Sequence, residues 1–120
     1  MRYAVATVVI VAALGLGGLG GYVLHGQGGI QVLGAGNSSC GTWLDNREAD
    51  DDDPWETIID SQWVNGYLTG RQDGEASGLT EQQTSDAAAR NIWLDNYCQA
   101  NPLDDLTDAA RGLWHELASR

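Results

Sequence analysis

Hydrophobic and polar positions divide the chain into an apolar start and a longer amphipathic part. Residues 4–24 carry no charged side chain, whereas all 17 carboxylates lie at or beyond Asp45. After residue 39, apolar residues recur at spacings of three and four, which places them on one face of a helix. No stretch shows the strict alternation of a half-buried strand. The pattern predicts an all-α domain over residues 39–120, a small bundle of three or four helices.

Cap-forming residues indicate where these helices begin. A short first helix is expected over residues 39–47. The sequence Asp53-Pro54-Trp55-Glu56 favours the start of a second helix, with Asp53 as the cap and Glu56 completing a capping box. The later helix starts are expected at three further cap positions: Thr80, Ser85 and Asn101.

Three of the expected helices have apolar residues that we predict to face a common core. In the second helix these residues are Trp55, Ile58, Ile59, Trp63 and Tyr67. In the third they are Ala88, Ala89, Ile92, Trp93 and Tyr97. In the last they are Leu103, Leu106, Ala110, Leu113 and Leu117. Gly66 and Gly70 flank Tyr67 and would let another element approach that helix closely.

Two cysteines, Cys40 and Cys98, lie 58 residues apart in the amphipathic part. An even cysteine count in a small chain with an apolar leader indicates a disulfide, because the compartment beyond the membrane is oxidising. Closing a loop of this length stabilises a fold by about 4 kcal/mol on the chain-entropy model. We therefore predict one Cys40–Cys98 bridge in a small helical domain.

Residues 1–25 indicate export, as either a signal peptide or a membrane anchor. Arg2 followed by the apolar run Ala4–Leu16 is typical of a cleavable secretory signal. Residues 4–24 are also long enough to span a bilayer as one transmembrane helix, with Arg2 on the inner side. Both alternatives place the acidic part in the periplasm or cell envelope, anchored in the inner membrane in the second case. Residues 26–38 are glycine-rich and predict a flexible linker.

Charge restricts the partners that this protein can bind. The chain has a net charge of −11, with six arginines and no lysine. Nucleic acids and anionic lipid headgroups are bound largely through basic side chains, so neither is an expected partner. Membrane contact is expected only through residues 4–24, and only where they are not cleaved. A basic polypeptide would be attracted.

No catalytic or metal-binding residue is predicted. Nucleophilic catalysis needs a base beside the nucleophile. The only histidines are His25, in or near the leader, and His115, which is expected on the surface of the last helix beside Glu116. The run from Asp73 to Glu81 resembles a calcium loop, but Thr84 stands where the bidentate glutamate is required. We therefore expect no enzyme activity, no metal and no cofactor.

Six aromatic residues are the candidate site: Trp55, Trp63, Tyr67, Trp93, Tyr97 and Trp114. The simplest interpretation places them in the core. The alternative is a groove for another polypeptide, or a homodimer interface. The indole N–H favours a position with a polar hydrogen-bond partner, and exposed apolar patches mark interaction sites.

Three stretches carry a resemblance to known families: Cys40-Gly-Thr-Trp43-Leu44, Trp63–Gly70 and Trp93–Leu103. Over residues 39–118 the chain resembles the HdeA-type periplasmic acid-stress chaperones. That resemblance implies a helical fold, a disulfide between an early and a late helix, and an amphipathic last helix. The chain departs from the family in lacking lysine and in its many tryptophans. It is also similar to the Tai-type immunity proteins, which neutralise cell-wall amidase toxins and have a Gly-Tyr-x-x-Gly stretch like Gly66–Gly70.

The expected function is therefore that of a non-enzymatic envelope protein that binds other polypeptides. As an HdeA-like stress-response chaperone, it would lose native carboxylate contacts as the pH falls through about 4, loosen its helices and expose aromatic residues to unfolded clients. As an immunity or inhibitor protein, its acidic face would bind a basic toxin or hydrolase. A third alternative is an anchored accessory subunit of a membrane complex.

Overall fold

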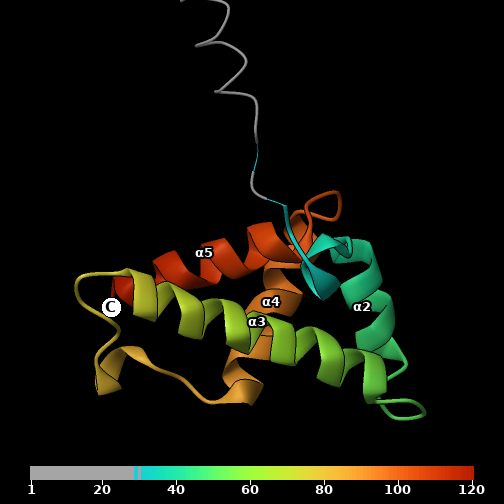
Figure 1. The fold of residues 1–120 in the computed structure, drawn as a ribbon. Helices are drawn as coiled ribbons and strands as arrows, with labels where there is room; N and C mark the ends of the chain where they lie inside the picture. Colours follow the sequence, from blue (N-terminus) through green and yellow to red (C-terminus); the bar gives the residue numbers. More distant parts are fainter. Residues whose placement is uncertain (1–28, 30) are drawn as a thin grey trace, which may run out of the picture. The chain divides into compact units, whose positions relative to one another are not determined.

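A computed structural model describes Gly29 and residues 31–120. Four α-helices and two short 3-10 helices follow one another in this range (Figure 1): η1 (Gly34–Asn37), α2 (Cys40–Glu48), α3 (Trp55–Gly74), η2 (Glu81–Gln83), α4 (Ala87–Ala100) and α5 (Leu106–Ala118). No strand occurs among the described residues, so the predicted all-α fold is confirmed. None of the described helices has the length and apolar character needed to cross a bilayer. The predicted leader, residues 1–25, lies outside the described residues.

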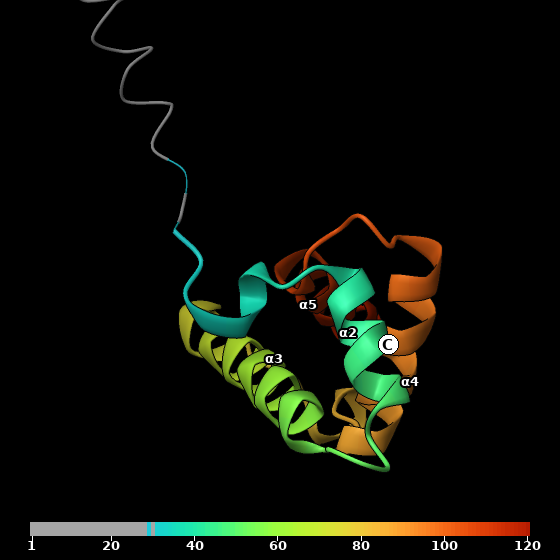
Figure 2. The same cartoon turned by 90° about the vertical axis from the view of Figure 1, so that its right-hand side faces the viewer.

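Helix α5 lies at the centre of the core. Its buried face contains Leu106, Ala109, Ala110, Leu113, Trp114 and Leu117. Helices α3 and α4 and the η1 segment pack against it, and Figure 2 shows α2 beside α4. The face predicted for this helix is confirmed from Leu106 onward. Leu103 is an exception, since it is 97% exposed in the loop before α5.

The predicted disulfide is present and joins α2 to α4. The Cα atoms of Cys40 and Cys98 are 4.8 Å apart, and both residues are fully buried. One turn before Cys98, Asp95 of α4 connects the same two helices. Its carboxylate accepts hydrogen bonds from Trp43 Nε1 at 2.9 Å and from Arg47 Nε and Nη2 at 3.0 and 3.1 Å. The bond with Asp95 raises the pKa of Arg47, although burial acts in the opposite direction.

Two predicted helix starts are displaced toward neighbouring aspartates. Helix α4 is capped by Asp86, whose side chain accepts from the Ala89 N–H at 2.8 Å, and not by Ser85. Helix α5 is capped by Asp105, four residues after the expected cap at Asn101. The backbone around Asp105 is held outside a helix, because Asp104 O accepts from Cys40 N and Leu106 N donates to Ser38 O.

The start of α3 also differs from the prediction. Pro54 occupies the cap position, and the Asp53 carboxylate accepts a hydrogen bond of 3.3 Å from Trp55 N. Helix α3 has no side-chain cap, so the capping box expected between Asp53 and Glu56 does not form. The Thr80–Gln83 box does form, but it closes the short η2 turn and does not begin α4.

The buried face of α3 is not the one predicted. It consists of Thr57, Asp60, Val64 and Leu68. The two polar members are satisfied by one residue of α2: Asn46 Nδ2 donates to Asp60 Oδ2 at 2.9 Å, and Asn46 O accepts from Thr57 Oγ1 at 3.2 Å. Trp55, Ile58 and Ile59 are consequently exposed. On α4, Ala88, Ala89 and Ile92 are exposed as well, and Leu94 and Cys98 form its buried face.

Two stacked Trp–Tyr pairs pack against glycines. Trp93 and Tyr97 have ring centroids 5.4 Å apart, and a Cβ on Gly112 of α5 would lie 3.0 Å from Trp93. Trp63 and Tyr67, 5.7 Å apart, form the second pair, and Trp63 lies against Gly36. Gly36 is buried in η1, so this part of the predicted flexible linker is instead a fixed part of the domain.

Candidate polypeptide-binding surface

The structure separates the six predicted aromatic site residues into three environments. Trp114 is buried in the core under Arg71, whose guanidinium lies 5.2 Å above the ring. Trp63, Tyr67, Trp93 and Tyr97 are partly buried and pack against the core. Trp55 alone is exposed, at 68%. The core interpretation is therefore wrong for Trp55, and the surface alternative applies to it.

Trp55 belongs to an apolar surface on α3. Ile58 and Ile59 are 42% and 53% exposed. Positions 55, 58 and 59 share one face of a helix because they are three and four residues apart. The buried residues Thr57 and Asp60 lie on the opposite face, which fixes the direction of this surface. We call Trp55, Ile58 and Ile59 the α3 patch.

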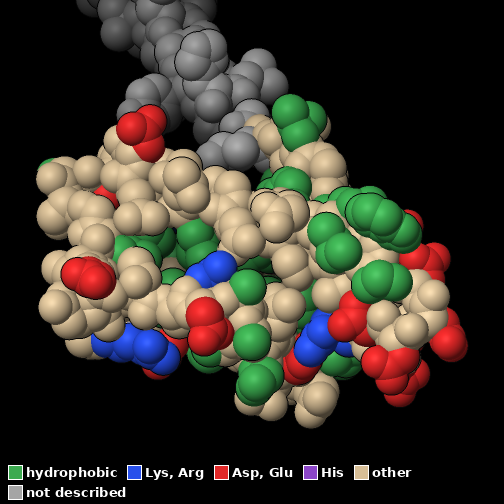
Figure 3. Space-filling model, turned by 90° about the horizontal axis from the view of Figure 1, so that it is seen from below, with side chains coloured by type: hydrophobic (Ala, Val, Ile, Leu, Met, Phe, Trp, Pro, Cys, Tyr) green, Lys and Arg blue, Asp and Glu red, His purple; other side chains and the backbone are tan. Residues whose placement is uncertain are grey.

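Carboxylates adjoin the α3 patch. Asp51, Asp52 and Asp53 precede α3 and are exposed, and Glu56 lies within its first turn and is also exposed. None of these four side chains takes part in an ion pair within residues 32–120. Figure 3 shows hydrophobic and acidic side chains next to one another at the right-hand end of the molecule, where α3 begins. The patch is thus an apolar surface with an uncompensated negative edge.

Toward the other end of α3, the exposed face contains two glycines. Gly66 and Gly70 are exposed, and a Cβ added to either would meet no described atom within 4 Å. The predicted close approach of another element is therefore not made within residues 32–120. A glycine inside a helix costs about 1 kcal/mol relative to alanine. Packing inside the described domain gives no reason for either glycine.

A buried carboxylate lies beneath the α3 patch. Asp60 is 3% exposed, and its hydrogen-bond donor is the neutral side chain of Asn46. Burial raises the pKa of Asp60, and the charge of Glu56 adds to this effect, whereas the hydrogen bond from Asn46 opposes it. A raised carboxyl pKa favours the folded state at acid pH. Asp60 therefore acts against an acid-triggered opening of α3.

The sequence contained a signal for the α3 patch that periodicity alone did not reveal. Ile58 and Ile59 share a helical face with Trp55, and that face starts directly after Asp50–Asp53. Charged residues that flank an apolar stripe on its own side favour a surface. A hydropathy count cannot distinguish the two faces when the buried one contains Thr57 and Asp60.

Comparison with known proteins leaves the family open. No protein-family model, no curated protein and no solved structure matches the chain. Membership of the HdeA-type or Tai-type families therefore stays a prediction.

Proposed function

We propose that this protein is a non-enzymatic envelope protein that binds another polypeptide through the α3 patch. The observation that carries the proposal is the exposure of Trp55, Ile58 and Ile59 beside four unpaired carboxylates. Exposed large apolar side chains gathered on one surface mark interaction sites, and tryptophan is enriched among residues that dominate binding.

The partner's chemistry follows from the edge of the patch. Carboxylates around an apolar centre favour a segment that combines apolar side chains with lysine or arginine, since complementary charge steers association and selects partners. The open face at Gly66 and Gly70 would let the backbone of such a segment lie close to α3. These features favour a basic polypeptide over an acidic or uncharged one.

Binding at neutral pH, as an inhibitor or immunity protein would require, agrees best with this geometry. The α3 patch is already exposed in the folded protein, so no acid-induced opening is needed. The raised pKa of Asp60 also favours the fold at low pH.

An HdeA-like chaperone is the second candidate. Its supporting observation is the ionic bond between Arg47 and Asp95, which joins α2 to α4.

A site-specific crosslinking experiment tests the proposal. The full chain carries a photoreactive amino acid at position 59 in its producing cell at neutral pH, and the matched control carries it at Ile92, an exposed apolar residue on α4. We expect position 59 to capture a defined basic protein that position 92 does not capture.

The affinity between the purified chain and the captured protein then tests the role of the α3 patch. Trp55→Ala and Ile59→Ala should each weaken binding by about 30-fold, as buried anchors do, and added salt should weaken it further. Equal capture at both positions, or unchanged affinity in both variants, would contradict the proposal. Suppression of client aggregation at pH 2–3 without neutral-pH binding would favour the chaperone instead.

A further inference from the structure

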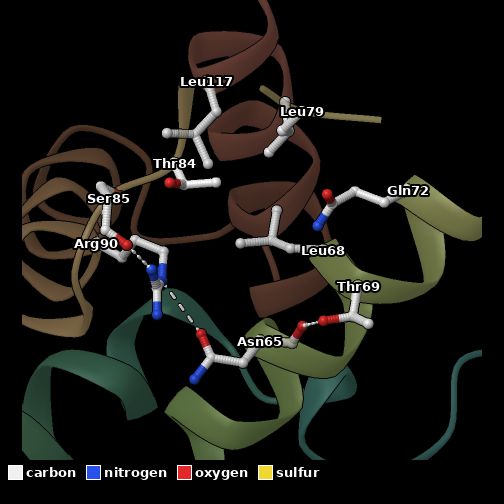
Figure 4. Close-up of a pocket in the computed structure, with 9 residues that line it drawn as sticks. All are labelled: Asn65, Leu68, Thr69, Gln72, Leu79, Thr84, Ser85, Arg90 and Leu117. Atoms are coloured by element: carbon white, nitrogen blue, oxygen red, sulfur yellow. Dashed lines mark hydrogen bonds between the residues drawn. The ribbon is translucent and has the colours of Figure 1, made fainter. Parts of the chain in front are cut away.

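A second surface feature lies away from the α3 patch. A pocket of about 150 Å³ opens between α3, the loop before α4, the first turn of α4 and the end of α5 (Figure 4). Its apolar wall is made by Leu68, Leu79 and Leu117, and its polar side includes Asn65, Ser85 and Arg90. None of its lining residues belongs to the α3 patch, and none is acidic.

Arg90 is the charged group of this pocket. Its Nε donates to Asn65 Oδ1 at 3.1 Å, and its Nη1 donates to the backbone oxygen of Ser85. Both acceptors are neutral. Figure 4 shows the guanidinium held between these two residues, with Leu79 and Leu117 at the other end of the view. A guanidinium has five N–H donors, so three remain for a ligand.

The absence of a counter-ion distinguishes Arg90 from the other arginines of residues 32–120. In each of the other four, a guanidinium nitrogen lies 2.8 to 3.9 Å from a carboxylate oxygen: Arg47, Arg71, Arg111 and Arg120. Arg90 has no such partner among the described residues. The chain contains 17 carboxylates, yet none of them lines the pocket that contains Arg90.

The loop that carries Leu79 and Ser85 is held in place by hydrogen bonds within the loop and to the end of α5. Gln83 Nε2 donates to Ala118 O at 3.0 Å, which fastens the loop to the end of α5. The Oε1 atom of the same side chain accepts from Thr80 N at 2.9 Å. These hydrogen bonds fix the position of the loop that contains Leu79 and Ser85. The shape of the pocket is therefore set by the fold itself.

We propose that this pocket binds a small monocarboxylate with a short apolar tail. The carboxylate would pair with the free N–H groups of Arg90, since guanidinium and carboxylate match in geometry. The tail would lie against Leu68, Leu79 and Leu117. A cavity of about 150 Å³ accommodates a group about as large as benzene. A tail of about five carbons, as in hexanoate, is therefore expected. A phosphate or nucleotide fits less well, because the wall is apolar and the pocket supplies one cation.

The test uses the full chain, ¹⁵N-labelled, with hexanoate as the probe in NMR titrations at neutral pH. We expect saturable shifts of residues around the pocket. Hexanamide, which has the same shape without the charge, should bind at least about tenfold more weakly, because hydrogen bonds to charged groups are stronger. Acetate, which lacks the tail, should also bind more weakly. Equal binding of hexanoate and hexanamide, or no saturable shift, would overturn the proposal.

Two variants locate the site. Arg90→Gln should reduce hexanoate binding at least about tenfold. The matched control is Arg111→Gln, which removes an exposed arginine paired with Asp108 outside the pocket and should leave binding unchanged. Equal loss in both variants would show a general charge effect and overturn the assignment. Where Arg90→Gln fails to fold, the comparison of hexanoate with hexanamide on the unmodified chain decides. Neither outcome depends on the α3 patch.

Discussion

Gly36 lies against the indole ring of Trp63 with no room for a side chain between them. A Cβ on Gly36 would lie 2.7 Å from Thr107 Oγ1 and closer still to the Trp63 ring. Thr107 Oγ1 donates to Gly36 O at 2.9 Å, and Trp63 Nε1 donates to Leu33 O at 2.6 Å. The segment before α2 is thereby fixed to both α3 and α5.

Gly36→Ala should destabilise the protein because the added methyl overlaps Trp63 and Thr107. Overpacking of this kind costs about 1–3 kcal/mol. Urea denaturation of the full chain measures it. Gly66→Ala is the matched control: its site is open, so it should raise the free energy of unfolding by up to about 1 kcal/mol. An unchanged midpoint for Gly36→Ala would show that the segment is not packed as described.

The disulfide should supply a large part of the stability. It closes a loop between residues 58 apart in the sequence, and cross-linking a loop of this length stabilises by about 4 kcal/mol. Cys40→Ala combined with Cys98→Ala should lower the free energy of unfolding by roughly that amount, measured in urea at neutral pH. A reducing agent should lower the unfolding midpoint of the natural chain and leave that of the double variant unchanged. The same midpoint with and without reductant in the natural chain would contradict this.

The helices and the bridge were predictable because they depend on local sequence and on cysteine count. Periodicity located the helices, and the face of α5 was correct from Leu106 to Leu117 because that face is apolar throughout. The start of α5 was not predictable. Asp104 and Leu106 use their backbone groups to bond with Cys40 and Ser38, a contact between distant parts of the chain.

The candidate surface was less predictable than the fold. Periodicity places the aromatic stripe of α3 in the core, because large apolar residues usually lie there. The structure buries Asp60 and Thr57 instead, since Asn46 of another helix satisfies them. No hydropathy pattern in α3 contains that information. Arg90 gave no signal either, because the lack of a counter-ion can be recognised only after the chain has folded.

Asp60 should make the unfolding free energy depend on pH in a particular direction. Its pKa in the folded protein is raised by burial. The stability that it contributes is fully present below the pKa of the unfolded chain and is lost as the pH rises through the folded value. Asp60→Asn removes the buried charge and retains an acceptor for Asn46. The variant should be more stable than the natural chain at neutral pH, with a difference that shrinks toward about pH 3.

Urea midpoints across this pH range measure the effect of Asp60→Asn. Asp45→Asn is the control, because Asp45 is exposed on α2 and its substitution should produce a much smaller change. A loss of stability at neutral pH in Asp60→Asn would show that the ionised carboxylate is favourable where it lies.

Tyr97 should titrate far above an ordinary tyrosine. Its hydroxyl donates to Asp104 Oδ2 at 2.6 Å, and this bond, with burial, raises the pKa of Tyr97 to about 12. Ultraviolet titration of the full chain should show one phenol ionising near that pH. Asp104→Asn should return the pKa of Tyr97 toward 10, whereas Asp73→Asn, at an exposed site on α3, should not.

The stability from the Tyr97–Asp104 hydrogen bond is present below about pH 10 and is lost as the pH rises through about 12. Tyr97→Phe should accordingly cost about 1–2 kcal/mol at neutral pH, and an unchanged unfolding midpoint would show that the bond contributes nothing to the junction between α4 and α5.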